Sequence, residues 1–224
     1  MLSILGYNLA DIGFFINLKE SQDRLNHVNT LIQKYEIKNL NRFDALTDEL
    51  RVFSCTKSHL KIFEDCLNKN IETVFICEDD FNIEDKCYYP HKEVFFKDVL
   101  DRVHNDLLNT EWDVVLFGCN PKEPLIEVTT NLVKVTKSSG SWAYIIKKRA
   151  YEYILKNSNY KRDYIAIDDY LPLLNSKGFT TLTTIPMIIN HGVGFISTMQ
   201  PGEPVNYNIW IRGNYDNFYF DLKK

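Results

Sequence analysis

The sequence predicts an α/β fold in which a mainly parallel central sheet is flanked by helices. In the first half of the chain, short runs of apolar and β-branched residues, such as Val74–Cys77, alternate with segments of helical periodicity. This alternation is typical of parallel strands joined by crossover helices. The 224 residues are 45% hydrophobic and 25% charged, a composition that is ordinary for a globular chain able to bury a core.

The first half gives the clearest elements. After a buried strand, the apolar positions Leu25, Val28 and Leu31 share one helical face, and Ser21 is placed to cap that helix. Thr73–Cys77 is a continuous apolar run typical of a central strand. In order, we expect strands at 13–18, 42–46, 73–77 and 112–118, and helices at 22–35, 56–68 and 92–109.

The second half contains shorter elements. We expect strands at 132–136, 141–146 and 179–184, and helices near 149–156 and 168–176. From about residue 198 the chain combines prolines, glycines and aromatic residues and is expected to form loops. We therefore predict a single domain over 1–224, with a core at about 12–195 and a C-terminal extension at about 196–224.

Composition excludes several classes. The net charge is −4 and no basic stripe is present, which argues against a nucleic-acid partner. The N-terminus lacks the features of a signal peptide, and no apolar run reaches the length of a membrane span. The five cysteines form no CxxC pair and are expected to be free thiols. These observations predict a cytoplasmic protein.

The acidic triplet Glu78-Asp79-Asp80 is the most informative feature. It follows a predicted central strand, and α/β proteins bind ligands beyond the carboxyl ends of their strands. Alternation in an extended segment would place Glu78 and Asp80 on one side and Asp79 on the other. Such oxygen ligands suit Mn²⁺ or Mg²⁺ bridging a diphosphate. A solvated acidic turn is an equal alternative from the spacing alone.

Several segments, in this order and over about residues 12–190, together resemble glycosyltransferase family 25, which includes lipooligosaccharide and procollagen galactosyltransferases. They are Phe15-Ile16-Asn17-Leu18, Arg42-Phe43-Asp44-Ala45, Cys55-Thr56-Lys57-Ser58-His59-Leu60, Phe75–Asp80, Trp112–Val115, Ser141–Ile146 and Ile167–Leu171.

The resemblance implies a GT-A-type single domain, a UDP-sugar donor and inversion at the anomeric carbon. It makes Asp80 the first candidate metal ligand, with Glu78 as a further ligand. It also implies donor contacts from residues spread along the chain, namely Asn17, Leu18, Arg24, Ser58, His59, Glu78, Asp79, Asp80, Gly140 and Trp142. From the residues alone, Gly140 and its serine neighbours form either a site for close approach of the donor or an ordinary turn.

Two further carboxylates and a histidine are candidates for chemistry. Inversion needs a base for the acceptor hydroxyl, and Asp169, or else Asp168, opens a predicted helix whose dipole would keep it ionised. One of the two could instead only cap that helix. His191 lies between an apolar run and glycines, where it is either a third metal ligand or a structural residue.

The sequence therefore predicts a hexosyltransferase that moves galactose or glucose from a UDP-sugar to a hydroxyl of a glycan or glycoprotein acceptor, assisted by Mn²⁺ or Mg²⁺. A metal-dependent phosphohydrolase and a non-catalytic nucleotide-sugar or glycan-binding module are the alternatives. The aromatic C-terminal tail, with Trp210 among others, either packs on the domain, stacks on an acceptor sugar or forms a homodimer contact.

Overall fold

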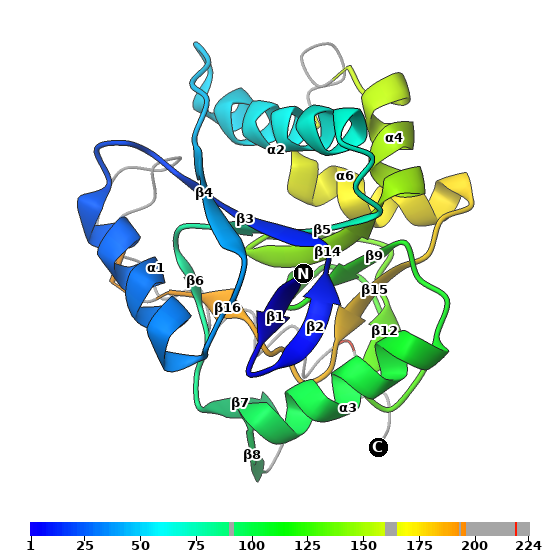
Figure 1. Ribbon diagram of the computed structural model, residues 1–224. Helices are drawn as coiled ribbons and strands as arrows, with labels where there is room; N and C mark the ends of the chain where they lie inside the picture. The colour runs from blue at the N-terminus through cyan, green and yellow to red at the C-terminus, as the bar shows by residue number, and fades with distance from the viewer. Residues whose placement is uncertain (90–91, 160–164, 193, 196–217, 219–224) are drawn as a thin grey trace.

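Eight strands form one central sheet in the computed structural model, in the order β11-β12-β15-β9-β14-β5-β3-β4 (Figure 1). The structure describes residues 1–89, 92–159, 165–192, 194–195 and 218. The sheet strands are β3 (Ile12–Asn17), β4 (Leu40–Asp44), β5 (Thr73–Glu78), β9 (Val114–Leu116), β11 (Ile126–Glu127), β12 (Leu132–Lys134), β14 (Ala143–Lys147) and β15 (Thr181–Thr184).

Six of the eight strands point the same way, because only β14 and β12 run antiparallel to both of their neighbours. The predicted α/β class and mainly parallel sheet are confirmed. The first-half strands β3, β4, β5 and β9 share one direction, as the alternation predicted, although the antiparallel β14 lies between β5 and β9. A buried antiparallel strand has the same continuous apolar pattern as a parallel one, so the sequence did not distinguish them.

Helices cover both faces of the sheet (Figure 1). One face carries α2 (Arg51–Asn68), α4 (Lys148–Asn157) and α6 (Ile167–Leu173), and α6 continues into a 3₁₀ turn at Leu174–Lys177. The other carries α1 (Gln22–Lys34) and α3 (Phe96–Asn109). Tyr35, just after α1, meets Phe96 of α3 edge to face, with ring centroids 5.3 Å apart. The core between these layers is continuous, and side chains such as Phe75 and Ile145 are almost fully buried.

Two helices begin elsewhere than predicted. The helix expected from residue 92 begins at Phe96, because Lys92–Phe95 forms strand β8 and pairs with β7 (Lys86–Tyr89). The helix expected from residue 56 begins at Arg51. Ser21 is the N-cap residue of α1, as predicted, but its side chain makes no capping hydrogen bond.

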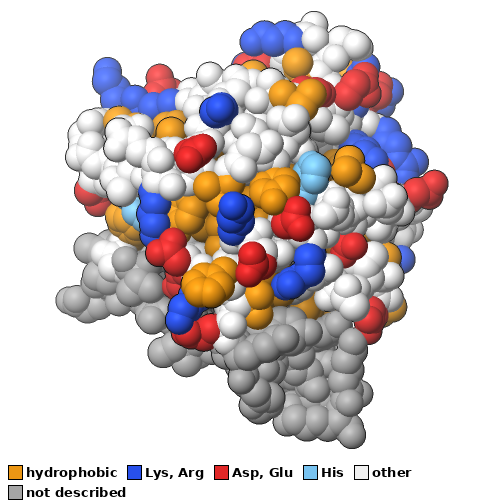
Figure 2. All heavy atoms as spheres, turned by 60° about the horizontal axis from the view of Figure 1, so that its bottom comes forward, with side chains coloured by type: hydrophobic (Ala, Val, Ile, Leu, Met, Phe, Trp, Pro, Cys, Tyr) orange, Lys and Arg blue, Asp and Glu red, His pale blue; other side chains and the backbone are white. Residues whose placement is uncertain are grey.

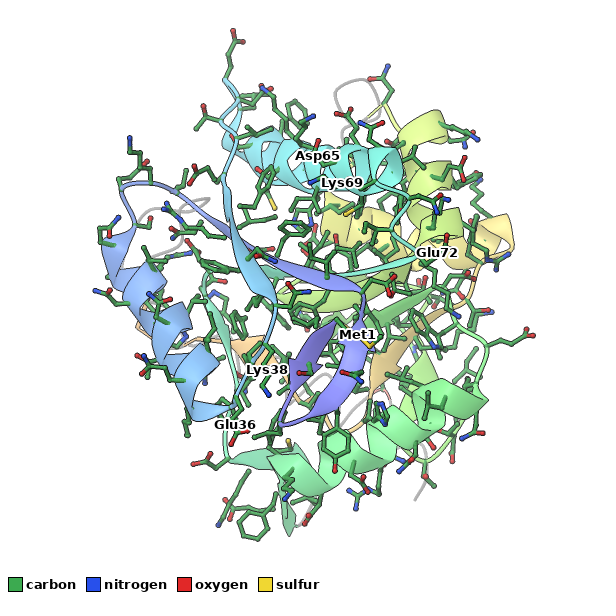
Figure 3. All side chains as sticks on the ribbon, in the orientation of Figure 1. Met1, Glu36, Lys38, Asp65, Lys69 and Glu72 are labelled. Carbon is green, nitrogen blue, oxygen red and sulfur yellow. The ribbon has the colours of Figure 1, made fainter. Side chains whose placement is uncertain are left out.

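An N-terminal hairpin was not predicted. β1 (Leu2–Ile4) and β2 (Tyr7–Ala10) pair with each other, and Ser3 exchanges two backbone hydrogen bonds with Lys38. Figure 3 shows Lys38 beside this hairpin. The apolar positions of so short a segment carry no period long enough to identify a strand pair.

The short strands β6 (Phe81–Asn82) and β16 (Asn190–His191) form a two-stranded pair, as do β10 (Asn120–Pro121) and β13 (Ser138–Ser139). No helix in the described part of the chain combines the length and apolarity needed to cross a bilayer. All five cysteines are free thiols. The face shown in Figure 2 mixes basic and acidic side chains with apolar ones. Apart from residue 218, the predicted C-terminal extension at 196–224 and its aromatic tail lie outside the described residues.

Candidate functional site

A buried ion cluster lies where β5 ends. Asp79 and Asp80 form the turn after β5, and the Arg24 side chain reaches them from the first turns of α1. Arg24 Nη1 lies 2.6 Å from Asp79 Oδ1 and 2.9 Å from Asp80 Oδ2. All three side chains are only 8% exposed. One guanidinium thus faces two carboxylates away from water, where charges interact strongly.

The end of the neighbouring strand holds Asp79 in place. Asn17, the last residue of β3, is fully buried, and its Nδ2 donates to Asp79 Oδ2 at 2.7 Å. Its Oδ1 accepts a hydrogen bond from Arg42 Nε at 2.9 Å. Because β3 and β5 are parallel neighbours, their carboxyl ends meet at the same sheet edge. Leu18 follows directly, and its carbonyl accepts from Ser21 N.

His191 joins this cluster through the small β6–β16 pair. In that pair His191 is opposite Phe81, so its Nε2 lies 3.4 Å from Asp80 Oδ2. The other carboxylate oxygen, Asp80 Oδ1, is buried and has no hydrogen-bond partner among the described residues. An unpartnered buried carboxylate oxygen costs free energy, which a bound cation would recover. Asp80 and His191 therefore fit a divalent metal ion.

The three adjacent acids differ in their pKa values. Burial raises the pKa of Asp80, but the hydrogen bond to His191 and the charges of His191 and Arg24 outweigh it and hold the pKa below its usual value. Burial raises the pKa of Asp79 despite the Arg24 guanidinium. Burial, followed by the charges of Asp80 and Asp168, raises the pKa of Glu78 to about 8. Of the three, only Asp80 has its pKa held below the usual value, and Asp80 is the first predicted metal ligand.

Glu78 contacts a different set of side chains from Asp80. Its Oε1 accepts from Ser141 Oγ at 3.0 Å and lies 4.0 Å from Cys55 Sγ. We expected an extended triplet with Glu78 and Asp80 on one side, but β5 ends at Glu78 and the next two residues form a turn. The contacts of Glu78 are with Ser141 and Cys55, whereas His191 contacts Asp80, and Glu78 as a ligand of the same ion stays a prediction.

Gly140 and Trp142 line the same edge from the segment before β14. Trp142 O accepts from Glu78 N at 3.0 Å, and the Trp142 ring meets His191 edge-on with centroids 6.3 Å apart. Gly140 has φ +84°, and a Cβ there would lie 2.5 Å from Trp142 Cζ2. Glycine is thus required twice over at Gly140, by the left-handed backbone and by the ring beside it.

The two predicted base candidates face different surroundings. Asp168 Oδ2 accepts from Gly140 N at 2.9 Å, so it ties α6 to the Gly140 segment. Asp169 has a side chain 52% exposed, 3.9 Å from Lys122 Nζ. Partial burial, and then the charge of Asp168, raises the pKa of Asp169, which opposes the expected effect of the helix dipole. Asp169 is the more accessible of the two.

Ser58 and His59 are enclosed. Ser58 Oγ accepts from Leu46 N at 2.9 Å and donates to Ser54 O at 2.9 Å. His59 is fully buried and its Nδ1 lies 2.7 Å from the Tyr144 hydroxyl. Both side chains have partners inside the protein, so they form no part of the donor site proposed below.

Three residues near the site escaped sequence reasoning. Cys55 lies against Glu78, and Phe195 places its ring 5.4 Å from the Arg24 guanidinium carbon. His27 meets the Phe195 ring edge-on, and its Nε2 lies 2.8 Å from Phe81 O. The only advance signal was the four-residue spacing of Cys55 and His59, which puts both on one face of a helix.

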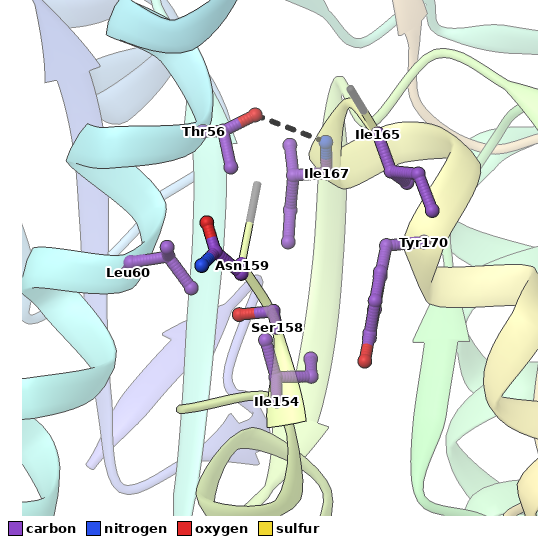
Figure 4. Close-up of a pocket in the computed structure, with 8 residues that line it drawn as sticks. All are labelled: Thr56, Leu60, Ile154, Ser158, Asn159, Ile165, Ile167 and Tyr170. Atoms are coloured by element: carbon purple, nitrogen blue, oxygen red, sulfur yellow. Dashed lines mark hydrogen bonds between the residues drawn. The ribbon is translucent and has the colours of Figure 1, made fainter. Parts of the chain in front are cut away.

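A separate pocket opens between α2, α4 and α6, and Figure 4 shows it. Thr56 Oγ1 closes one side by accepting a hydrogen bond from Ile167 N at 3.2 Å. The pocket is lined mainly by apolar side chains and by none of the carboxylates described above. Its lining residues are Thr56, Leu60, Ile154, Ser158, Asn159, Ile165, Ile167 and Tyr170.

Comparison with known families identifies the chain. Residues 49–171 match the model of glycosyltransferase family 25, described as an LPS biosynthesis protein. The chain belongs to glycosyltransferase family 25. This match takes in more than half of the 224 residues, including α2, the acidic triplet and the α6 aspartates. The predicted family is thereby confirmed.

The family 25 chain is similar to procollagen galactosyltransferase 1-B of Xenopus laevis, with 24% identity over 199 residues. The match covers 73% of this chain but only 31% of that protein, so this chain spans about a third of its relative. Similar solved structures include A197 from STIV, with 14% identity, a TM-score of 0.45, and 77% of this chain and 80% of that chain covered.

Another is UDP-glucose pyrophosphorylase complexed with UDP-glucose, with 8% identity, a TM-score of 0.42, and 92% of this chain and 75% of that chain covered. Likeness at these scores is too loose to bear on function.

Proposed function

We propose that this family 25 chain transfers a hexose, galactose or glucose, from a UDP-sugar to a hydroxyl of a glycan or glycoprotein acceptor. The observation that carries the proposal is the buried cluster of Arg24, Asp79, Asp80 and His191 beyond the ends of β3 and β5. The galactosyltransferase named among its relatives supports the sugar and acceptor class.

In this proposal Asp80 and His191 hold a Mn²⁺ or Mg²⁺ ion. The unpartnered Asp80 Oδ1 gives that ion a ligand oxygen, and Asn17 and Arg24 fix the neighbouring carboxylate of Asp79. The ion would neutralise the diphosphate that leaves with the nucleoside. Arg24 adds a positive charge to the same place and can pair with phosphate oxygens.

The acceptor side is assigned to α6. Asp169 is exposed, and its raised pKa makes it a stronger base than an ordinary aspartate, so it takes the proton of the attacking hydroxyl. Asp168 positions the Gly140–Trp142 segment through its bond to Gly140 N, and Trp142 closes the edge beside His191. Attack from the face opposite the leaving group gives inversion.

The test is release of UDP from UDP-galactose and UDP-glucose with Mn²⁺, in the presence and absence of acceptors. Asp80→Asn should lower the rate by about 10²-fold or more, because it removes charge stabilisation at the leaving diphosphate. Asp65→Asn is the matched control, since the Asp65 side chain is 40% exposed on α2 and pairs with Lys61. Full turnover by Asp80→Asn would overturn the assignment, and UDP binding without sugar release would favour the non-catalytic module.

A further inference from the structure

A second group of side chains suited to metal binding includes Glu78, the first residue of the acidic triplet. Cys55 and His59 are one turn apart on α2, and Glu78 ends β5 opposite them. One ligand atom from each of the three lies within 4.8 Å of the other two. Among the described residues, no other group of three His, Cys, Asp or Glu side chains meets this spacing.

His59 supplies an independent observation. It is fully buried, and its Nδ1 pairs with the Tyr144 hydroxyl at 2.7 Å, whereas its Nε2 is buried and has no hydrogen-bond partner in the part of the chain that the structure describes. Burial lowers the pKa of His59 to about 3, so the imidazole is neutral. When Nδ1 donates to Tyr144, Nε2 carries a lone pair that nothing in the described structure uses. An oriented neutral imidazole is the usual form of a metal-binding histidine.

The chemistry of the three side chains selects the ion. A cysteine thiolate with an imidazole suits zinc or cobalt, whereas Mn²⁺ and Mg²⁺ prefer oxygen ligands. A thiolate and a carboxylate together balance one divalent charge. Tetrahedral zinc has ligand bonds of about 2.0–2.3 Å, so its ligand atoms lie roughly 3.5 Å from one another. The three ligand atoms, which here lie within 4.8 Å of one another, would therefore have to approach by about 1 Å.

We propose that Cys55 Sγ, His59 Nε2 and the Glu78 carboxylate bind a zinc-class divalent ion, at a site separate from Asp80 and His191. Three protein ligands leave a fourth position for water. The Cys55 thiol and the Glu78 carboxyl group, where it is protonated, give up their protons to solvent on binding, and no oxidation or reduction takes place. The ion would join α2 to the end of β5. This inference does not depend on the proposed transferase activity.

The experiment uses the full chain, stripped of metal with a chelator and titrated with Co²⁺ under reducing conditions. We expect the near-ultraviolet charge-transfer band of a Co²⁺–thiolate bond, which saturates at a single equivalent and disappears when Zn²⁺ displaces the cobalt. Cys55→Ser should abolish this band. Cys87→Ser is the matched control, because Cys87 is a buried thiol in β7, outside the cluster, and this variant should retain the band.

Two further measurements keep the outcome decisive. In the unaltered protein, Zn²⁺ should slow alkylation of Cys55, mapped by peptide mass, so the result does not depend on a variant folding. Asp80→Asn should retain the cobalt band, which separates this site from the proposed donor site. Absence of a thiolate band in the unaltered protein, or its persistence in Cys55→Ser, would overturn the proposal.

Discussion

At the scale of single residues, the site depends on side chains that meet from distant parts of the chain. Arg24 lies 55 residues before Asp79, yet the two are joined by a buried ion pair. Removing one partner of such a pair typically costs about 3–5 kcal/mol, because the other charge stays buried without compensation. The same cluster that we expect to bind the donor therefore also contributes to the stability of the fold.

Gly140 allows a residue-scale prediction with a matched control. Both Gly140 and Gly178 have φ +84°, but a Cβ at Gly178 would meet nothing within 4 Å. Gly178→Ala should therefore cost only the left-handed backbone penalty of about 1–2 kcal/mol. Gly140→Ala should cost about 1–3 kcal/mol more, because its methyl group collides with Trp142.

Denaturant unfolding of the two glycine variants gives the comparison. Equal losses in the free energy of unfolding would show that Trp142 moves aside without cost, which would contradict the packing described for this segment.

At the scale of elements, β14 lies near the centre of the sheet, between β5 and β9. Ile145 of β14 is fully buried and lies opposite Phe75 of β5 and Val115 of β9. Ile145→Ala should lower the free energy of unfolding by about 2–5 kcal/mol through lost burial and a cavity.

Ile126→Ala serves as the control, because Ile126 on the edge strand β11 is 56% exposed. Its effect should stay within about 0.5 kcal/mol of zero, as is usual for surface positions. Thermal or urea unfolding of both variants checks the contrast. A small loss from Ile145→Ala would show that the centre of the sheet repacks easily.

The elements also show what the sequence could and could not predict. Thr73–Cys77 and the helix stripe at Leu25, Val28 and Leu31 were found because their apolar periods are strong and local. The place of β14 and the pairing of Arg24 were not, because both depend on contacts between distant segments. The turn at Asp79 and Asp80 was not predicted, because the acidic triplet carries no local signal that separates a turn from the end of a strand.

At the scale of the whole molecule, donor binding should couple to stability. A ligand that binds only the folded state stabilises it by about 2.7 kcal/mol at a hundred times its dissociation constant. For a chain of 224 residues, each kcal/mol raises the unfolding midpoint by roughly 2–4 °C. UDP with Mn²⁺ should therefore raise the midpoint by about 5–10 °C.

Differential scanning fluorimetry with UDP alone, Mn²⁺ alone and both together measures this effect. The joint shift should exceed the sum of the separate shifts and should vanish in Asp80→Asn. A full shift with UDP and a chelator would contradict a metal-bridged diphosphate.

The antiparallel direction of β14 has a consequence for engineering the sugar specificity of the proposed transferase. Because β14 is antiparallel to β5 and β9, the segment Gly140–Trp142 before β14 lies at the sheet edge where β5 ends. This is the edge of the proposed donor site. This segment is held by the hydrogen bond from Gly140 N to Asp168 Oδ2, and the buried strand β14 follows it. Substitutions at Trp142 that keep Gly140 should therefore change the sugar preference of the proposed transferase with little effect on β14.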